Sequence, residues 1–518
     1  MGTARRRCWI SIASVVLGGL LVLISGVAPA VAATTFRIAV GVDPDTLDPV
    51  QMTTTTVGNM VDYVVETLTT IDSTGKILPM LAESWTASAD GTQYTFKLRQ
   101  GVTFHDGTPF DAKAVKWNLD RLIDPAVRVP IRAPYPIAKT DVVDAHTVRV
   151  TLKHPYAPLV GALSWTTSGL VSPAAADRDG NTYKDYTHLV GTGPYVFKER
   201  RKGEMITVTK NAKYWGRKPY YDTVVFRIVP EAATRESLLL ADQVDLIILP
   251  PVADLQALGR NSAVKVILAP SDRTIFIAIN TTKGILSDRR VRQALNYAVD
   301  KDAIIKNVLF GAADPMDAPM ASSLFGYCKV GSYPHDPAKA KALLAEAGVK
   351  PGTAMQVIHP TGRYVQDKES TEAVAGFLRE VGIEPSLQTM DWPSYIRTIT
   401  TPVDKNTTQL QFLGWAPAFL DASQQVLQFL STYAPPSGLE TSFYKNAEAD
   451  RLIQAAEREL NPAKRRDLYC ELSKRVWDDA PWIFLWVQRF PIVYSAKVTD
   501  VSSLPNEKFY ALYARPAK

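Results

Sequence analysis

Two stretches, AMQVIHPTGRY at residues 354–364 and QLQFLGWAPAFLD at residues 409–421, say most about the fold. Each starts as an apolar strand, turns through a loop with functional side chains, and leads into a helix pattern. Such loops gather at the carboxyl ends of strands, where ligands bind in α/β sheets. The loops offer a guanidinium, a phenol, an indole and a carboxylate, from Arg363, Tyr364, Trp415 and Asp421. This set of side chains suits binding of a small polar ligand better than catalysis.

The sequence around these loops alternates strand and helix patterns. Apolar strand patterns cover 354–358, 383–389 and 409–413, while helix patterns cover 368–381 and 423–431. This alternation is typical of βαβ units, and it predicts an α/β fold with a largely parallel sheet in this half of the chain.

Further strands and helices precede and follow this region. Asp111 is expected to cap one helix and Ser287 another, and Trp477 and Trp482 are expected in the core. The last segment, residues 498–518, is short and has a mixed pattern. It should therefore return to an earlier domain and not form one of its own. The other expected strands are Thr35–Val40, Tyr94–Leu98, Val224–Val229, Val244–Leu249 and Thr274–Asn280.

Residues 1–33 form a segment unlike the rest of the chain. Arg5-Arg6-Arg7 precedes the apolar run Trp9–Ile24, and Val31-Ala32-Ala33 resembles a cleavage site. This pattern predicts a cleaved secretory signal peptide and export to the periplasm. An uncleaved membrane anchor is the alternative, and the sequence leaves open whether export follows the Sec or the twin-arginine route.

Length, charge and cysteines narrow the class of protein. A chain of 518 residues should form more than one domain. Loss of the three Arg in 1–33 lowers the net charge from +6 to +3, and no basic stripe remains, so nucleic acid is not an expected partner. Cys328 and Cys470 remain in the exported chain, where one disulfide is expected, although two buried thiols would give the same sequence.

Several blocks along the chain resemble the extracytoplasmic solute-binding proteins of peptide, nickel and related ABC importers, family 5. The resemblance implies two lobes, residues 34–274 with 484–518 and residues 275–483, the first with an inserted subdomain at about 60–185. It also implies a type II periplasmic-binding-protein fold with a ligand cleft between the lobes, closure around a hinge, and delivery to a permease in the inner membrane. The matching blocks are 81–85, 94–98, 101–110, 191–195, 211–215, 288–295, 336–348 and 478–482.

Ligand roles carry over from this family only in part. Arg363 occupies the position that implies an anchor for a ligand carboxylate, with a salt bridge as the alternative. Ala418 replaces the Asp that holds a peptide's free amine in relatives. Asp421 lies three residues later and is expected to cap a helix more often than to contact ligand.

The remaining candidates each have two interpretations. Trp415 and Tyr364 either pack against ligand or support the loops from below. Thr54 and Thr55 either line the first-lobe side of the cleft or belong to a solvated loop. His105-Asp106 falls in a structural turn of the family, and no catalytic residue, metal site or cofactor is expected.

The sequence therefore predicts a monomeric periplasmic binding protein of an ABC importer and not an enzyme. The expected ligand is a peptide or peptide-like anionic solute, with a modified or γ-linked amine end such as that of glutathione. A metal chelate, an opine or a sugar-linked acid is the rival within this class. A secreted hydrolase and a periplasmic chaperone are the rivals from other classes.

Overall fold

The computed structural model describes residues 34–518 except 45, 53, 73, 126, 128–134 and 179–188. The signal peptide predicted at 1–33 lies outside the described residues. Within the described part, no helix combines the length and the apolar character needed to cross a membrane.

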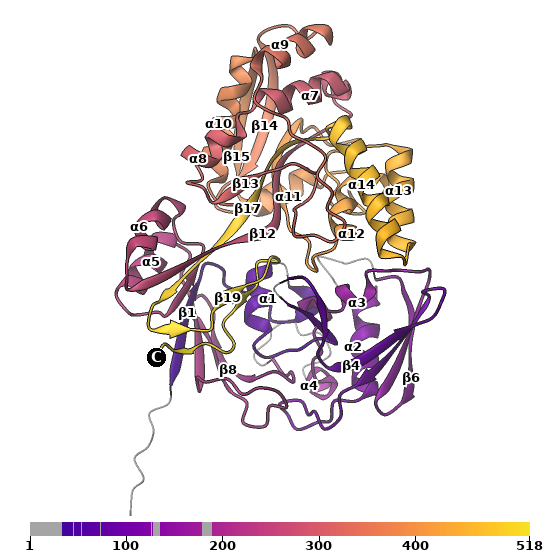
Figure 1. Cartoon of the computed structure of the whole chain (residues 1–518), viewed down its shortest axis with the longest axis vertical. Helices are drawn as coiled ribbons and strands as arrows, with labels where there is room; N and C mark the ends of the chain where they lie inside the picture. The colour runs from indigo at the N-terminus through magenta and orange to yellow at the C-terminus, as the bar shows by residue number, and fades with distance from the viewer. Residues whose placement is uncertain are drawn as a thin grey trace, which may run out of the picture. The chain divides into compact units, whose positions relative to one another are not determined.

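The described residues form one large mixed sheet of eleven strands that runs through both lobes (Figure 1). Ten of its strands follow one another in the order β15 (Ile383–Met390), β14 (Thr353–Pro360), β16 (Leu410–Trp415), β12 (Val264–Ile279), β17 (Trp482–Ser495), β11 (Leu246–Ile248), β1 (Thr35–Val40), β10 (Thr223–Ile228), β9 (Met205–Lys210) and β8 (Tyr195–Arg201). The short strand β13 (Ala313–Pro315) pairs with β17 off this path.

Two long antiparallel strands, β12 and β17, connect the lobes. The N-terminal part of β12 pairs with the C-terminal part of β17 in lobe I, and Thr274–Ala278 pairs with Trp482–Val487 in lobe II. The pairing is interrupted between Pro270 and Thr274. The sequence predicted only the second part of β12, because Pro270 and the polar residues after it look like the end of a strand.

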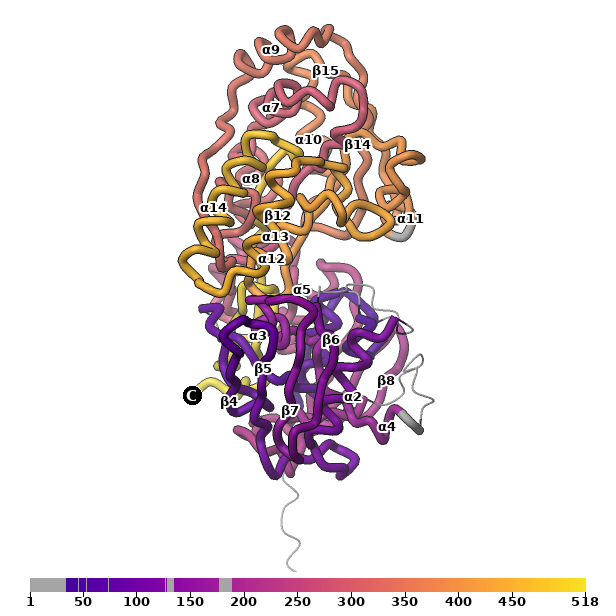
Figure 2. Tube along the Cα trace, turned by 90° about the vertical axis from the view of Figure 1, so that its right-hand side faces the viewer, coloured from indigo at the N-terminus to yellow at the C-terminus, as the bar shows by residue number. Residues whose placement is uncertain are grey.

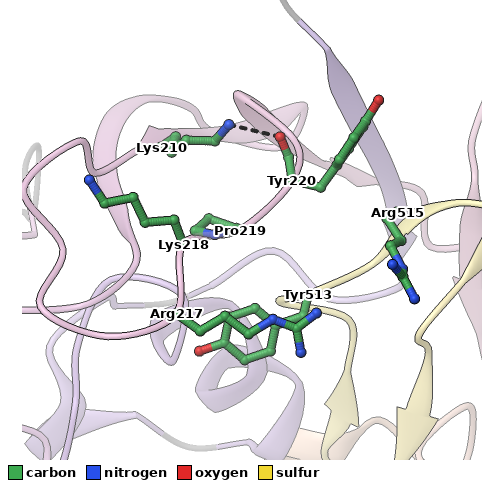
Figure 3. Close-up of a pocket in the computed structure, with 7 residues that line it drawn as sticks. All are labelled: Lys210, Arg217, Lys218, Pro219, Tyr220, Tyr513 and Arg515. Atoms are coloured by element: carbon green, nitrogen blue, oxygen red, sulfur yellow. Dashed lines mark hydrogen bonds between the residues drawn. The ribbon is translucent and has the colours of Figure 1, made fainter.

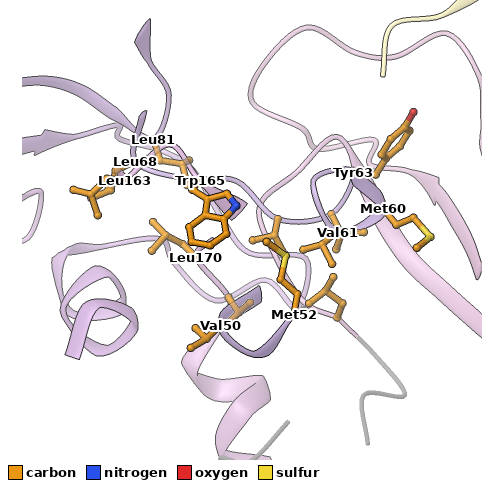
Figure 4. Close-up of a cluster of buried hydrophobic side chains, with 14 of the residues drawn as sticks. Val50, Met52, Met60, Val61, Tyr63, Leu68, Leu81, Leu163, Trp165 and Leu170 are labelled. Carbon is orange, nitrogen blue, oxygen red and sulfur yellow. The ribbon is translucent and has the colours of Figure 1, made fainter. Parts of the chain in front are cut away.

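Lobe I carries a second, four-stranded antiparallel sheet. Its order is β4 (Ala82–Ala87), β5 (Gln93–Leu98), β7 (Thr147–Leu152) and β6 (Ile137–Asp144). Helix α2 (Ala112–Ile123) packs on it and begins at the predicted cap, since Asp111 accepts a hydrogen bond from the Ala114 amide at 2.9 Å. Apolar side chains, including Trp165, Met52 and Leu170, fill the interior between the two sheets (Figure 4).

Lobe II surrounds its end of the main sheet with helices. Helix α10 (Asp367–Glu380) packs on β14 and β15, while α7 (Arg289–Ala298) packs on β17 and lies beside α9 (Pro337–Glu346). Helices α13 (Ala447–Arg458) and α14 (Pro462–Asp479) run side by side (Figure 2). Trp482 is buried and stacks on Phe276 with ring centroids 3.4 Å apart, and Trp477 is buried as well. Both tryptophans are therefore in the core, as predicted.

Three local predictions for lobe II are wrong. Asp288, not Ser287, caps α7, because its carboxylate accepts from the Arg290 amide. Helix α12 (Ala422–Gln425) ends early, and a 3₁₀ turn at Val426–Phe429 replaces the rest of the predicted helix. Within lobe II the sheet is parallel only among β15, β14 and β16, because both crossovers, β12 and β17, run antiparallel to their neighbours there.

Apolar packing supports the two-lobe division proposed from the sequence. One cluster of buried side chains is drawn mainly from residues 36–249 and 490–514, and two others mainly from residues 275–486. The boundaries between the lobes, at 274 and 484, remain the proposal made above.

Candidate functional site

The loop that carries Arg363 is held in place by one carboxylate. Strand β14 ends at Pro360, and Asp367 accepts hydrogen bonds from the backbone amides of Gly362, Arg363 and Tyr364 at 3.2, 2.9 and 3.1 Å. Asp367 itself opens α10, where a carboxylate is favoured by the helix dipole. No role for Asp367 was predicted from the sequence, although an acidic residue in the first turn of a helix, just after a polar loop, is a known signal for this arrangement.

The guanidinium of Arg363 lies over two aromatic rings that are nearly perpendicular to each other. Its central carbon is 4.9 Å from the ring centre of Tyr364 and 5.1 Å from that of Trp392. Among the described residues, no side chain or carbonyl accepts a hydrogen bond from this half-buried guanidinium, and no carboxylate pairs with it. Burial lowers the pKa of Arg363, as expected for a cation whose solvent has been partly removed.

Tyr364 joins the two loops that the sequence singled out. Its hydroxyl donates to the Gly414 carbonyl at 3.2 Å, and its ring is 7 % exposed. A Cβ at Gly414 would lie 2.7 Å from the Tyr364 ring and 2.6 Å from Ile275, so only glycine permits this approach. The structure thus brings the two predicted loops together and uses Tyr364 as the support between them.

Trp415 ends β16 and is partly buried. Its carbonyl accepts from the Thr274 hydroxyl at 3.2 Å, and its ring packs against the apolar cluster of lobe II. The indole nitrogen has no partner among the described residues although it is shielded from solvent. An N–H group in this condition is available to an acceptor on a ligand.

Asp421 is engaged by the protein itself. Its carboxylate accepts from the Ser423 amide at 2.9 Å, which makes it the predicted N-cap of α12. The same carboxylate pairs with Arg465, whose two terminal nitrogens lie 2.8 and 2.5 Å from its oxygens. With its charge balanced in this way, Asp421 is not a free acceptor for a ligand amine, and a ligand role for it stays a prediction.

Thr54 and Thr55 lie at the start of α1 (Thr55–Val61) in lobe I. The Thr54 hydroxyl accepts from the Val57 amide at 3.3 Å and so caps the helix, while Thr55 is half-buried in its first turn. Helix capping accounts for Thr54 without a ligand, and the cleft role of both residues stays a prediction.

The sequence did not indicate a role for the loop Pro505–Lys508. Arg273 of β12 donates to Glu507 at 2.7 Å in a buried bidentate ion pair. Burial alone would lower the pKa of Arg273, but the attraction of Glu507 outweighs it and the pKa is raised. Because 234 residues separate these partners, no local pattern could have paired them.

The same loop contacts three parts of the fold. The Asn506 amide donates to the Ala418 carbonyl of the second predicted loop at 3.2 Å, and Asn59 of α1 donates to the Glu507 carbonyl at 3.0 Å. The Asp272 amide of β12 donates to the Pro505 carbonyl at 2.8 Å. The C-terminal loop therefore ties lobe I and the crossover to the candidate site in lobe II.

Other features of the chain lie apart from this site. His105 contacts the Gly193 carbonyl at 3.0 Å, and the Asp106 carboxylate accepts from Ser172 at 2.7 Å, so both stabilise a turn. Among the described residues, no group of three or more His, Cys, Asp and Glu side chains is placed to hold a metal ion. Cys328 and Cys470 form a disulfide that ties the 325–331 loop to α14.

A cavity of about 400 Å³ in lobe I contains none of the predicted site residues (Figure 3). Two of its cations are paired, Lys210 with Asp222 and Arg515 with Asp500, each at 2.7 Å. Its lining consists of Lys210, Arg217, Lys218, Pro219, Tyr220, Tyr513 and Arg515.

Comparison with known proteins places this arrangement in a family. Residues 76–436 match the model of the bacterial extracellular solute-binding proteins, family 5. The glutathione-binding protein GsiB of Pectobacterium atrosepticum is 32% identical over 485 residues, which cover 93% of this chain and 94% of that protein. GsiB of Salmonella typhimurium is 31% identical over 490 residues, with the same coverage.

Solved structures agree in fold. The periplasmic binding protein DppA of Helicobacter pylori, in complex with the peptide STSA, matches with a TM-score of 0.81 at 26% identity, over 92% of this chain and 98% of that one. AgaA of A. tumefaciens R10, in complex with agropinic acid, matches with a TM-score of 0.80 at 25% identity, over 93% and 99%. The chain has the two-lobed architecture of these proteins and belongs to the bacterial extracellular solute-binding proteins of family 5.

Proposed function

We propose that this protein is the periplasmic binding component of an ABC importer and that it captures a peptide or peptide-like anionic solute. Capture is reversible and makes or breaks no covalent bond. The two lobes close on the ligand, and a permease in the inner membrane receives it from the closed form. The protein acts in this role as a monomer.

The observation that carries this proposal is the unpaired cation at Arg363. A half-buried guanidinium without an acceptor is unfavourable unless an anion completes it. The rings of Tyr364 and Trp392 lie under it and offer no hydrogen-bond acceptor, so its N–H groups are available to a carboxylate. Two parallel hydrogen bonds from an Arg fork to a carboxylate are strong and orienting.

The other groups suit a peptide-like molecule. The unpartnered Trp415 indole N–H faces no acceptor within the described chain, and an amide carbonyl of a ligand would supply one. The names of the GsiB relatives, each at least 31% identical, add glutathione as the first compound to try. An opine is the second candidate, because AgaA is solved with agropinic acid.

The test is to identify the ligand directly. The exported protein is purified from its native compartment and analysed by native and then denaturing mass spectrometry. Isothermal titration calorimetry with glutathione, a dipeptide panel and agropinic acid follows on the emptied protein. Binding of a peptide or γ-glutamyl acid supports the proposal, agropinic acid alone favours the opine reading, and failure to bind any acid contradicts both.

A further inference from the structure

Asp272 occupies an unusual place on the crossover strand. It lies in the interval between Pro270 and Thr274, where β12 and β17 lose their regular pairing. Its backbone amide is bonded to Pro505, and the next residue, Arg273, pairs with Glu507. The side chain therefore lies where the crossover strand, the C-terminal loop and the candidate site meet.

The Asp272 carboxyl is completely buried and unsatisfied. Its exposure is 0 %, and neither of its oxygens has a hydrogen-bond partner among the described residues. Buried acceptors without a donor are rare and costly, because the group loses water and gains nothing in return. The Asp272 carboxyl therefore has hydrogen-bonding capacity that the described residues do not use.

The charges around Asp272 connect it to Arg363. The charged groups acting on Asp272 are Glu507 and Arg273, and the same two act on Arg363. Burial first, and then Glu507, raises the pKa of Asp272 well above its ordinary value. The charges of Arg273 and Glu507 balance each other, so with Asp272 protonated these three side chains together are neutral. Arg363 is close to the Asp367 carboxylate as well.

From this arrangement we infer that Asp272 accepts the ammonium group of the ligand whose carboxylate Arg363 binds. This inference rests on the proposed function, and it makes the ligand an acid that carries a free amine. An ammonium group provides three donors, enough to satisfy both oxygens of Asp272. The Arg273–Glu507 pair lies within electrostatic reach of both anchors and holds the crossover strand against the C-terminal loop.

Binding of the amine changes the protonation of Asp272. The carboxyl gives up its proton to the buffer, and the ligand ammonium takes the proton's place as the balancing positive charge. Because Asp272 is fully buried in this structure, the ligand reaches it only after the protein around it moves. The proton release is a consequence that a purely structural aspartate would not produce.

The experiment compares matched ligands that differ only in the amine. Glutathione is compared with glutaryl-cysteinylglycine, and L-alanyl-L-alanine with propanoyl-L-alanine, by calorimetry in buffers of different ionisation enthalpy. Wild type should bind the amine-bearing member of the recognised pair at least about tenfold more tightly, with release of about one proton. Asp272→Asn, which mimics the protonated acid, should lose both the preference and the proton release.

Glu440→Gln is the matched control. It removes another buried carboxyl of raised pKa, on a segment of lobe II apart from this cluster, and should keep the preference and the proton release. Equal binding of both members of a pair by wild type, or equal weakening of both by Asp272→Asn, would overturn the role of Asp272 while leaving the proposed function intact. Binding of no probe at all would overturn the proposed function and this inference with it. The wild-type comparison decides the matter even if Asp272→Asn does not fold.

Discussion

Arg465 of α14 forms an ion pair with Asp421, so the carboxylate at the end of the second predicted loop has a structural role. The exposed fractions of the two side chains are 6 % for Arg465 and 13 % for Asp421. Phe325 packs under the guanidinium at 4.9 Å, and its backbone forms a bridge with Asp421. The loop that begins at Trp415 is thereby fixed at its far end.

Asp421→Asn should destabilise the protein through Arg465. The substitution leaves a buried guanidinium without its counter-ion, which costs about 3–5 kcal/mol in comparable sites. Urea unfolding followed by tryptophan fluorescence measures the loss. Glu384→Gln, which breaks the exposed pair with Arg379, is the control and should leave stability almost unchanged. If Asp421→Asn and Glu384→Gln had the same free energy of unfolding, the buried ion pair would not contribute to stability.

Arg363→Gln should weaken capture of the ligand. Hydrogen bonds to charged groups contribute about 1.5–3 kcal/mol, so affinity should fall about tenfold to a hundredfold. Arg363→Lys keeps the charge but not the fork, and should recover only part of the loss. Calorimetry with the acid identified by mass spectrometry gives both values. If Arg363→Gln binds as tightly as wild type, Arg363 does not contact the ligand.

Glu440 should make stability fall as the pH rises. Burial raises its pKa from 4.5 to about 8 in the folded protein, so between these values the native state binds more protons than the unfolded state. The contribution of Glu440 to the free energy of unfolding is fully present below pH 4.5 and is lost as the pH rises toward 8. The total loss is a few kcal/mol.

Unfolding of wild type and Glu440→Gln in urea at pH 5, 6.5 and 8 tests this sign. The free energy of unfolding of the Gln variant should depend less on pH than that of wild type. Relative to wild type, the variant should therefore be more stable at pH 8 than at pH 5. If the free energy of unfolding changed equally with pH in wild type and in Glu440→Gln, the raised pKa of Glu440 would be contradicted.

The disulfide between Cys328 and Cys470 should stabilise lobe II against unfolding. It closes a loop with a sequence separation of 142, and loss of a native disulfide typically costs about 2–5 kcal/mol. Thiol titration of the unfolded exported protein should find no free thiol before reduction and two after it. The double variant Cys328→Ser/Cys470→Ser should lower the melting temperature to that of the reduced wild type. Two reactive thiols without reductant would show that the bond is absent.

Sequence reasoning was most successful where a single element carries its own signal. Strand β1 spans the predicted Thr35–Val40, and Asp111 caps α2 as expected, because alternation and capping are local effects. The approach of the two binding loops also followed from the sequence, since both leave one edge of a sheet. The N-cap of α7 was predicted one residue too early, at Ser287, because Ser287 and the neighbouring Asp288 can both accept a hydrogen bond from the first turn of a helix.

Contacts between distant segments could not be predicted. Asp421 pairs with Arg465, and Arg273 pairs with Glu507. Each ion pair joins residues that are far apart in the sequence, so it depends on the tertiary fold and not on a local pattern. The burial of Asp272 follows from the same return of the C-terminal loop. These long-range contacts decide which acids are free for a ligand, so residue roles at the site were harder to foresee than the fold.

The pairing of β11 with β17 has a consequence for how the protein would fold during the export proposed above. Strand β1 and its neighbours would emerge first from the membrane, but β11 stays an open edge until Ile492–Tyr494, near the end of the chain, arrives. Residues 275–486, in contrast, are contiguous and supply most of two clusters of buried side chains. Lobe I is therefore completed last, and until translocation ends its unpaired edge is the part of the nascent protein most exposed to aggregation and most in need of a chaperone.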